Sequence, residues 1–462
     1  MEYQEAVEYL LAIPKFAGKT SHDNLRGFLN KLQNPQDDIP AIHIAGTNGK
    51  GSTCAFLASI LRQAGCRVGM FTSPHLVKVN ERFQLNGEVI SDRELVEMFC
   101  LVKNVVEEGI KEGLVHPNFF EFIFMMALCW YRRKNDVKKN GQGVDFVIYE
   151  TGLGGRLDAT NILKPCLTVI TSIGLDHMQY LGDTIEQIAG EKAGILKPNT
   201  PCVYLSKPES ACNVIEARGS QLNIPMISVE TERISIQKND GDRIDFRYQT
   251  KYDRECGRDT GEYHIRKTAL YQLENAVLAL EAGGYVLQHI WEKRYKVQDG
   301  EDREVLNLYE CLQQGLSDMY WRGRMEEILP DFYVDGAHNE PAILAFCDTI
   351  NRIYRDKKII LLFAVSCDKS YNEMIRILCS RISFDKVIVT AIGGVRTTPV
   401  SDVADIFSTY AACPVVCEGD LRVAFEAARE LLNGENRVFC VGSLYLVGSI
   451  LECVQKDIDR TI

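Results

Sequence analysis

The chain has 462 residues, of which 46% are hydrophobic and 25% are charged, and its formal net charge is −11. This composition is typical of a globular protein with a substantial core, and the length corresponds to two or three domains. It excludes a disordered chain, a fibrous repeat and a small disulfide scaffold. The acidic charge also disfavours a nucleic-acid partner, because binding to a phosphate backbone needs a basic face.

The 16 cysteines are spread singly along the chain, and no two of them form a CxxC pair. This spacing excludes the usual zinc sites, and we expect most of the thiols to be buried as small hydrophobic side chains. Reduced thiols indicate a cytoplasmic protein. The N-terminus lacks the basic start of a signal peptide, and the apolar stretch over 119–130 is too short to cross a membrane. We therefore expect no membrane partner.

Apolar runs alternate with helical patterns in the first part of the chain, which predicts a parallel α/β sheet. Residues 228–268 alternate polar and apolar positions between turn signals, which predicts a small antiparallel sheet. A second α/β block begins near residue 320. We therefore expect a first domain over 1–318 and a smaller one over 319–462. The predicted strands of the first part cover 39–46, 144–150 and 166–174, and a helix is predicted over 52–65.

The turn GTNGKGS at 46–52 follows the first predicted strand and is the strongest local signal. Its glycines let the backbone wrap around an anion, and the helix that follows adds the positive end of its dipole. Lys50 supplies a mobile charge for the outer phosphates, and a hydroxyl of Ser52 or Thr53 can face Mg²⁺. The turn departs from the strict phosphate-loop pattern, because Ile44 replaces the first glycine and Gly51 follows the lysine. A strand–helix turn without a ligand is the alternative.

Two further strand ends carry polar side chains. Glu150 ends the predicted strand 144–150 and precedes a turn with three glycines, and His177 follows the strand 166–174. Open parallel sheets bind ligands at the carboxyl ends of their strands, so we expect Lys50, Glu150 and His177 at one edge. Glu150 and His177 could share Mg²⁺ with phosphate oxygens, although histidine is an uncommon ligand for so hard an ion. Solvated loops are the alternative.

Several more polar residues have weaker signals. Ser73 lies in a loop before Pro74, and Lys192 by itself resembles an exposed helix lysine. The second block carries polar residues that could reach a nucleotide, or could equally belong to solvated loops. These are Arg322, Arg324, Asp335, His338 and Asn339.

Eight short motifs together resemble the folylpolyglutamate synthase/dihydrofolate synthase family, which belongs to the Mur ligase superfamily. The resemblance covers essentially the whole chain, and its most specific motif is E-x-G-L-G-G-R-x-D-x-T-N. In this family GTNGKG is the usual form of the phosphate loop, which accounts for both departures from the strict pattern. In chain order the motifs are GTNGKGS, TSPHL, YETGLGGRLDATN, SIGLDH, EKAGI, WRGRME, DGAHN and GSLYL.

This resemblance implies an α/β fold, with a P-loop ATPase domain that has a parallel central sheet and a small antiparallel sheet, then a smaller Rossmann-like C-terminal domain. It implies phosphate contacts by Asn48, Gly49, Lys50, Gly51 and Ser52, and further ATP contacts by Asn275, Arg324 and Asp335. It implies magnesium ligation by Ser73, Glu150 and His177. It implies a pterin-binding side at Phe119, Phe120, Glu121, Phe122, Leu157, Asp158 and Ala159, and a glutamate side at His338 and Ser443. Lys192 matches a lysine that is carbamylated in related enzymes, a change that would make it an anionic ligand for a second Mg²⁺.

The implied activity is that of an ATP-dependent ligase that adds L-glutamate to a folate or dihydropteroate carboxylate through an acyl phosphate. We expect a monomer whose partners are these small molecules, with Lys50, Lys192 and His338 as its catalytic residues. Two alternatives stay open. One is a Mur-type ligase that acts on a cell-wall nucleotide precursor, and the other is a regulatory module that hydrolyses ATP without ligation. Whether dihydropteroate, tetrahydrofolate or both are used is also open, and we expect the segment 16–29 to bear on this choice.

Overall fold

The computed structural model describes residues 1–14, 21–136, 143–255, 257, 259–266, 269–291, 307–393 and 397–461. Residues 16–20 of the segment expected to bear on acceptor choice lie outside this set, as do four positions within 228–268. The chain forms two compact units. The first comprises Met1–Ser235, Arg247–Tyr263 and Glu274–Met319, and the second comprises Ile236–Phe246, His264–Leu273 and Tyr320–Ile462. The domain boundary between 318 and 319 stays a prediction.

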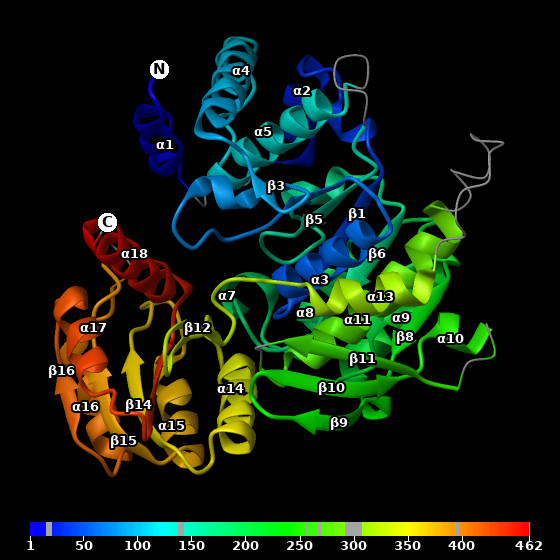
Figure 1. Cartoon of the computed structure of the whole chain (residues 1–462). Coiled ribbons are helices and arrows are strands. Elements are labelled where there is room, and N and C mark those ends of the chain that lie inside the picture. Colours follow the sequence, from blue (N-terminus) through cyan, green and yellow to red (C-terminus); the bar gives the residue numbers. More distant parts are fainter. Residues whose placement is uncertain are drawn as a thin grey trace. The chain divides into compact units, whose positions relative to one another are not determined.

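A mixed, mostly parallel sheet forms the centre of the first unit (Figure 1). In its middle, β5, β1 and β6 are parallel neighbours, with Ile44 beside both Glu150 and Val169. Their apolar runs are continuous because both faces of the sheet are covered. This arrangement confirms the predicted parallel sheet, and the three predicted strands lie side by side in it. In sheet order the strands are β4 (Glu88–Val89), β3 (Phe83–Leu85), β2 (Val68–Phe71), β5 (Phe146–Glu150), β1 (Ala41–Ala45), β6 (Leu167–Ile170), β7 (Cys202–Leu205) and β8 (Met226–Val229).

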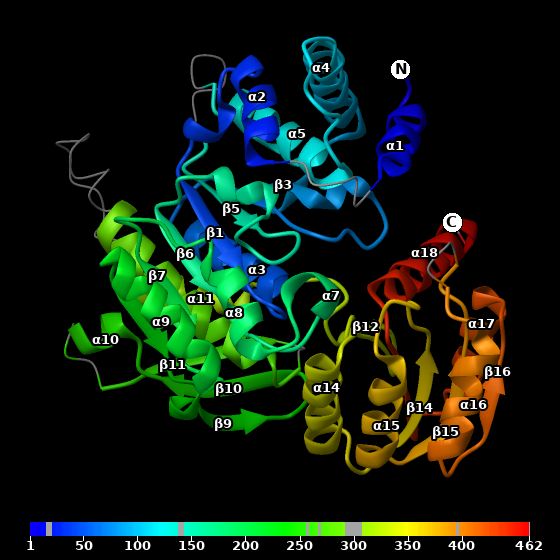
Figure 2. The ribbon, with the colours of Figure 1, turned by 180° about the vertical axis from the view of Figure 1, so that it is seen from behind.

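Helices cover both faces of this sheet (Figures 1 and 2). α3 packs against α13 on the face seen in Figure 1, whereas α8 and α9 pack against each other and come to the front in Figure 2. A second apolar cluster joins α1, α2, α4 and α5 to Phe71, Val147 and Tyr149 of the sheet. The helices are α1 (Tyr3–Ala12), α2 (His22–Lys31), α3 (Lys50–Gln63), α4 (Asp92–Lys111), α5 (Phe119–Lys134), α7 (Met178–Leu181), α8 (Ile185–Ala193), α9 (Glu209–Leu222), α10 (Lys251–Glu255), α11 (Gln272–Val286) and α13 (Leu308–Ser317), with the short helical turn η3 at Ala159–Ile162.

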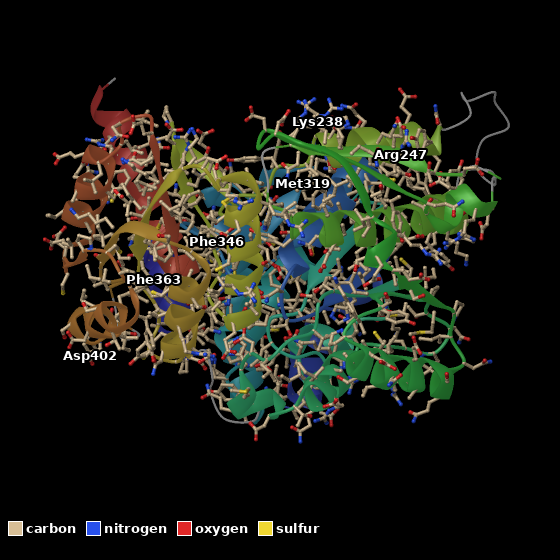
Figure 3. All side chains as sticks on the ribbon, turned by 90° about the horizontal axis from the view of Figure 1, so that it is seen from below. Lys238, Arg247, Met319, Phe346, Phe363 and Asp402 are labelled. Atoms are coloured by element: carbon tan, nitrogen blue, oxygen red, sulfur yellow. The ribbon has the colours of Figure 1, made fainter. Side chains whose placement is uncertain are left out.

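The predicted small antiparallel sheet is present, with strand order β11–β10–β9. Its strands are β9 (Ser235–Asn239), β10 (Arg243–Tyr248) and β11 (Gly261–Arg266). Apolar and polar positions alternate along β10 because one face is buried and the other is solvated. Lys238 and Arg247 extend from the solvated face in Figure 3.

The second unit contains a further α/β sheet, in the order β12–β13–β17–β14–β15–β16. β12 pairs antiparallel with β13, and the other pairs are parallel. Phe346 and Phe363 are buried in its core (Figure 3). The strands are β12 (Glu326–Leu329), β13 (Phe332–Val334), β14 (Lys358–Phe363), β15 (Phe384–Val389), β16 (Val415–Cys417) and β17 (Asn436–Val441), and the helices are α14 (Glu340–Ile353), α15 (Tyr371–Arg381), α16 (Val400–Tyr410), α17 (Leu421–Glu430) and α18 (Leu444–Thr461).

Within the described ranges, none of the helices of either unit has the length and apolar content needed to cross a membrane.

A buried carboxylate on α11 holds the segment that follows β10. Glu281 accepts hydrogen bonds from the hydroxyl of Tyr248, at 3.2 Å, and from the backbone N–H of Lys251, at 3.0 Å. Burial raises the pKa of Glu281 from its ordinary value of 4.5 to about 7, because the charged form loses its hydration. Glu281 therefore carries a proton in the folded chain at a pH where the unfolded chain has released it.

This difference makes stability depend on pH. Between about pH 4.5 and pH 7 the folded chain binds more protons at Glu281 than the unfolded chain, so the free energy of unfolding falls as the pH rises through that window. We expect the free energy of unfolding of the wild type to fall by on the order of 3 kcal/mol across this window, and we expect Glu281→Gln to lack this fall. Urea unfolding of the wild type and of Glu281→Gln from pH 4.5 to 8 measures the difference. Glu108→Gln, at an exposed position, is the control, and parallel curves for wild type and Glu281→Gln would contradict the prediction.

Candidate functional site

The turn between β1 and α3 requires glycine at two positions. A Cβ at Gly46 would lie 1.8 Å from Oγ1 of Thr171, and a Cβ at Gly49 would lie 2.1 Å from Oδ1 of Asn275. Gly49 also has a φ of +83°, which side chains other than hydrogen disfavour. Asn275, predicted to contact ATP, is therefore next to the predicted phosphate-binding turn.

The end of β6 holds this turn in place. The N–H of Thr47 donates to the carbonyl of Ser172 at 2.7 Å, and the hydroxyl of Thr171 donates to the carbonyl of Asn48 at 2.6 Å. The Thr47 hydroxyl donates to the carbonyl of Gly174 at 3.0 Å. Neither Thr171 nor Ser172 is among the site residues predicted from the sequence. Their signal was their place directly after a buried strand that neighbours β1.

Two lysines converge on one carbonyl of the turn. Nζ of Lys50 donates to the carbonyls of Gly46, at 3.0 Å, and Thr47, at 3.1 Å, and Nζ of Lys192 donates to the carbonyl of Gly46 at 2.8 Å. Lys192 is only 3% exposed, so the structure rules out the exposed helix lysine that its sequence context allowed. Burial, with a contribution from the charge of Lys50, lowers the pKa of Lys192 to about 7.

The predicted metal ligands follow or end three strands of the first sheet, β2, β5 and β6. Glu150 ends β5 and is buried, and its Oε2 accepts the backbone N–H of Ser73 at 2.9 Å. His177 immediately precedes α7 with a φ of +51°, and its Nε2 lies 3.8 Å from Oδ2 of Asp176. Ser73 and Glu150 are thus in direct contact, and the imidazole of His177 lies beside the carboxylate of Asp176.

Hydroxyl groups in the first turn of α3 and directly after β5 lack hydrogen-bond partners among the described residues. Oγ of Ser52, Oγ1 of Thr53 and Oγ1 of Thr151 are buried without a partner among the described residues. Unsatisfied buried polar atoms are costly, and a bound ligand can satisfy them. No three His, Cys, Asp or Glu side chains of the described ranges gather into a metal site. One carboxylate with nearby hydroxyls fits Mg²⁺ that arrives with phosphate oxygens, rather than a closed protein cage.

The glycine-rich turn after β5 is organised by Asp158. This buried carboxylate accepts the N–H groups of Gly152, at 2.9 Å, and Leu153, at 2.8 Å. A Cβ at Gly155 would lie 2.7 Å from the carbonyl oxygen of Glu191, so the turn runs directly along the backbone of α8 beside Lys192. Leu157 in the same turn is 71% exposed, and Ala159 is buried at the start of η3.

The four residues at the start of α5 differ in their surroundings. Phe119 and Phe122 belong to the apolar core. Glu121 caps the helix by accepting the N–H of Asn118 at 2.9 Å. Phe120 is half-buried, and its ring would lie 2.8 Å from a Cβ at Gly152. Phe120 thus contacts the turn after β5, and the roles of all four in binding a pterin stay predictions.

The predicted site residues of the second unit surround the end of β13. The carboxylate of Asp335 is buried and accepts the N–H groups of Met325, at 2.9 Å, and Ala337, at 2.8 Å, and the hydroxyl of Tyr271. Burial raises its pKa above the usual value. In three further contacts, Arg324 donates to the carbonyl of Gly323 at 3.1 Å, Nδ1 of His338 lies 2.8 Å from the carbonyl of Gly336, and the N–H of Tyr445 donates to Oγ of Ser443 at 3.1 Å. Their roles toward a nucleotide or glutamate stay predictions.

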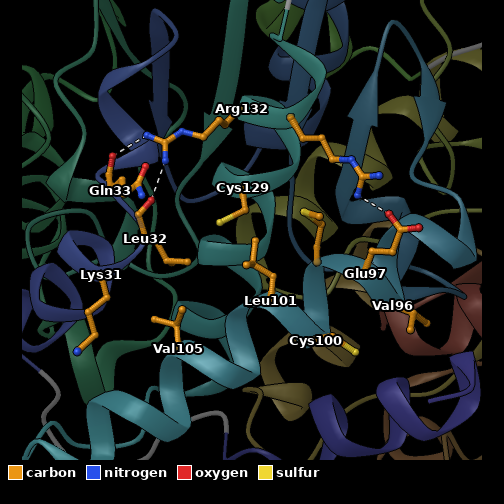
Figure 4. A pocket seen from close by; sticks show the side chains of 12 residues that line it. Lys31, Leu32, Gln33, Val96, Glu97, Cys100, Leu101, Val105, Cys129 and Arg132 are labelled. Atoms are coloured by element: carbon orange, nitrogen blue, oxygen red, sulfur yellow. Dashed lines mark hydrogen bonds and ion pairs between the residues drawn. The ribbon is translucent and has the colours of Figure 1, made fainter. Parts of the chain in front are cut away.

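A groove of about 780 Å³ lies elsewhere in the first unit, between α2, α4 and α5 (Figure 4). Leu101, Val105 and Cys129 are among its apolar lining residues. Its arginines are engaged: Arg132 donates to the carbonyl of Gln33 at 2.6 Å, and Arg133 pairs with Glu97. None of the predicted site residues lines this groove.

Known proteins resemble this chain over most of its length. Residues 325–453 match the family model "Dihydrofolate synthetase, C-terminal domain". The dihydrofolate synthase/folylpolyglutamate synthase of Bacillus subtilis (strain 168) is 35% identical over 381 residues, which cover 81% of this chain and 82% of that protein. The crystal structure of a folylpolyglutamate synthase from Thermotoga maritima superimposes with a TM-score of 0.77 at 28% identity and covers 98% of this chain and 97% of that one. An FPGS–AMPPCP–folate complex gives a TM-score of 0.76 at 26% identity, with coverage of 97% and 98%.

Gly49→Ala tests the predicted phosphate-binding turn. The new methyl group would meet the Asn275 side chain and strain a backbone with positive φ, so we expect the affinity for ATP to fall at least about tenfold. Gly65→Ala is the matched control, because Gly65 has a φ of +79° but no atom within 4 Å of its Cβ position. Isothermal titration with a non-hydrolysable ATP analogue measures both. Equal affinities of the two variants would contradict the prediction.

Proposed function

Because the chain belongs to the folylpolyglutamate synthase/dihydrofolate synthase family, we propose that it is an ATP-dependent ligase that joins L-glutamate to the carboxylate of a folate or of dihydropteroate. One observation carries the proposal: the ammonium groups of Lys50 and Lys192 meet at the carbonyl of Gly46, within a glycine-rich turn at a helix start. Such a concentration of positive charge and backbone N–H groups suits a triphosphate. The FPGS–AMPPCP–folate complex, a relative of the same fold, binds an ATP analogue and folate together.

The first step activates a carboxylate, which is a poor electrophile. A carboxylate oxygen attacks the γ-phosphorus of ATP, a new O–P bond forms, and the bond from phosphorus to the bridging oxygen of ADP breaks. Negative charge on the phosphoryl oxygens must be stabilised during this transfer. Lys50 suits this role, because its present acceptors are neutral carbonyls that a phosphate oxygen can replace. We assign further ATP contacts to Asn48, Gly49, Gly51, Ser52 and Asn275 of the first unit.

The second step forms the amide. The amine of glutamate attacks the acyl carbon, a tetrahedral intermediate forms, and phosphate leaves with the electrons of the C–O bond while the amine loses a proton. Positioning of the two reactants supplies most of the acceleration that such a step needs. In the second unit, we assign contacts with the nucleotide to Arg324 and Asp335. We assign contacts with the incoming glutamate to His338 and Ser443.

Magnesium fits the strand ends beside the turn. Ser73, Glu150 and His177 would hold it, and the unpartnered hydroxyl of Ser52 offers a further oxygen. When bound, Mg²⁺ neutralises charge on the phosphates. Lys192 would serve a second ion as a carbamate. Carbamylation needs an unprotonated amine, and a pKa of about 7 leaves a large share of Lys192 unprotonated near neutral pH.

The pterin side is assigned to the turn after β5 and the start of α5, where Phe120 and the exposed Leu157 have free surface for a ring system.

The cysteines that the structure describes are all free thiols. Such thiols fit a reducing compartment, and we assign the protein to the cytoplasm.

We expect Lys50→Ala and Glu150→Ala to reduce ligation at least about a hundredfold, because each removes a charge that the phosphoryl transfer needs. The measurement is incubation with ATP, glutamate and either dihydropteroate or tetrahydrofolate, with products resolved by mass. Lys164→Ala and Glu108→Ala are the controls, since both positions are exposed, and circular dichroism checks folding.

Near-wild-type turnover of either site variant would contradict the residue assignment. A wild-type protein that hydrolyses ATP without forming an amide would instead be a regulatory module. A product formed only from UDP-linked precursors would identify a cell-wall ligase.

Carbamylation predicts that activity depends on dissolved CO₂. We expect the ligation activity to fall severalfold in CO₂-depleted buffer and to return when bicarbonate is added. The increase in activity on adding bicarbonate should grow as the pH rises through 7, because more of Lys192 is then unprotonated. Lys192→Ala should show no bicarbonate response. A crystal of the active, ligand-bound enzyme with a bare ammonium at Lys192 would contradict the assignment.

A further inference from the structure

A buried histidine in β1 takes no part in the two ligation steps. His43 lies three residues before Gly46, and its side chain is on the same face of the sheet as those of Ala41 and Ala45, because strand side chains alternate. It is fully buried. A polar ring in this position is costly unless its hydrogen bonds serve the structure.

Hydrogen bonds connect His43 to the turn after β5. Nε2 of His43 lies 2.7 Å from Oγ1 of Thr160, and Oγ1 of Thr160 lies 2.5 Å from Oδ1 of Asp158. The other carboxylate oxygen of Asp158 accepts the N–H groups of Gly152 and Leu153. The path therefore runs from the middle strand of the sheet to the backbone immediately after Glu150.

The direction of these bonds follows from the donors present. Burial lowers the pKa of His43 to about 3, so the ring is neutral at pH 7 and has one N–H. The carboxylate of Asp158 can only accept, so the hydroxyl proton of Thr160 points to Asp158. The hydroxyl oxygen must then accept a hydrogen bond from the N–H at Nε2 of His43. Nδ1 of His43 has no partner among the described residues, so the ring is held through this bond.

Other polar supports join the turn to β1 and to two helices, and the N–H of Thr151 donates to the carbonyl of Ile44 in β1 at 2.9 Å. The carbonyl of Asp158 is contacted by Nε2 of His22, on α2, at 2.9 Å, and Arg156 pairs with Glu191 of α8. His43 belongs to β1, which pairs with β5 on one side and with β6 on the other. It can therefore transmit the rigidity of the sheet to the turn.

We propose that His43 is a positioning residue that acts through Thr160 and Asp158 to hold the turn 151–158 in the conformation that receives the pterin substrate. The ordering of the turn is independent of the proposed function, whereas the identity of the substrate rests on it. Two readouts therefore separate the two ideas.

The first readout is hydrogen exchange. His43→Leu removes the donor, and His43→Gln restores an N–H at nearly the position of Nε2. We expect deuterium uptake in peptides covering 151–160 to speed up about tenfold in His43→Leu, and to stay within about twofold of wild type in His43→Gln. Thr160→Val and Thr160→Ser form a second pair of the same design, should His43→Leu fail to fold. Unchanged exchange in both disruptive variants would overturn the proposal.

The second readout is kinetic. In His43→Leu we expect the KM for the folate or dihydropteroate substrate to rise about tenfold, with the KM for ATP within about twofold of wild type and rescue by His43→Gln. The double variant His43→Leu/Thr160→Val should be no worse than Thr160→Val alone, because both act on one path. A fall in kcat or melting temperature with an unchanged KM would show a merely structural role and overturn the proposal. A wild type that glutamylates no folate would refute the proposed function, while the exchange experiment would still decide whether His43 orders the turn.

Discussion

The carbonyl oxygen of Gly46 accepts hydrogen bonds from two lysine side chains, Lys50 and Lys192, and the candidate site is arranged around this shared acceptor. Two ammonium groups at one neutral oxygen repel each other. This repulsion and the burial of Lys192 both disfavour the charged form of Lys192 and lower its pKa. Anions would relieve this repulsion. A triphosphate on the side of Lys50 and a carbamate at Lys192 would both supply negative charge, so the proposed phosphate binding and the proposed carbamylation would answer the same electrostatic constraint.

The turn that provides this carbonyl is stabilised from both neighbouring strands. On the β6 side, Thr171 and Ser172 bond to the backbone of the turn itself. On the β5 side, Glu150 binds the backbone of Ser73, and Asp158 holds the turn that follows. Functional groups on the loops after these strands are thereby held by strands whose relative positions the sheet determines. Precise placement of this kind is what phosphoryl transfer needs from a protein.

Several buried carboxylates have backbone N–H groups as their main partners. Glu281 accepts from Lys251, Asp158 from Gly152 and Leu153, and Asp335 from Met325 and Ala337. Burial raises the pKa of each, and the hydrogen bonds offset part of that cost. Their shared effect is to hold irregular backbone in fixed conformations. For Asp158 and Asp335, motif residues of the family, this explains why a carboxylate suits the position even before a ligand is considered.

The amino-acid sequence by itself determined the glycine-rich turn after β1, the polar strand ends and the two α/β blocks, because glycine spacing and apolar runs are local patterns. It also predicted that Lys50, Glu150 and His177 lie at one edge of the sheet, since parallel strands end at a common edge. It could not distinguish the buried Phe119 and Phe122 from the half-buried Phe120, nor reveal that Lys192 is buried. Tertiary structure decided these, and also the contact of His43 with Thr160, 117 residues away. Such contacts depend on which segments the sheet brings together, and no local sequence pattern predicts a contact between residues so far apart along the chain.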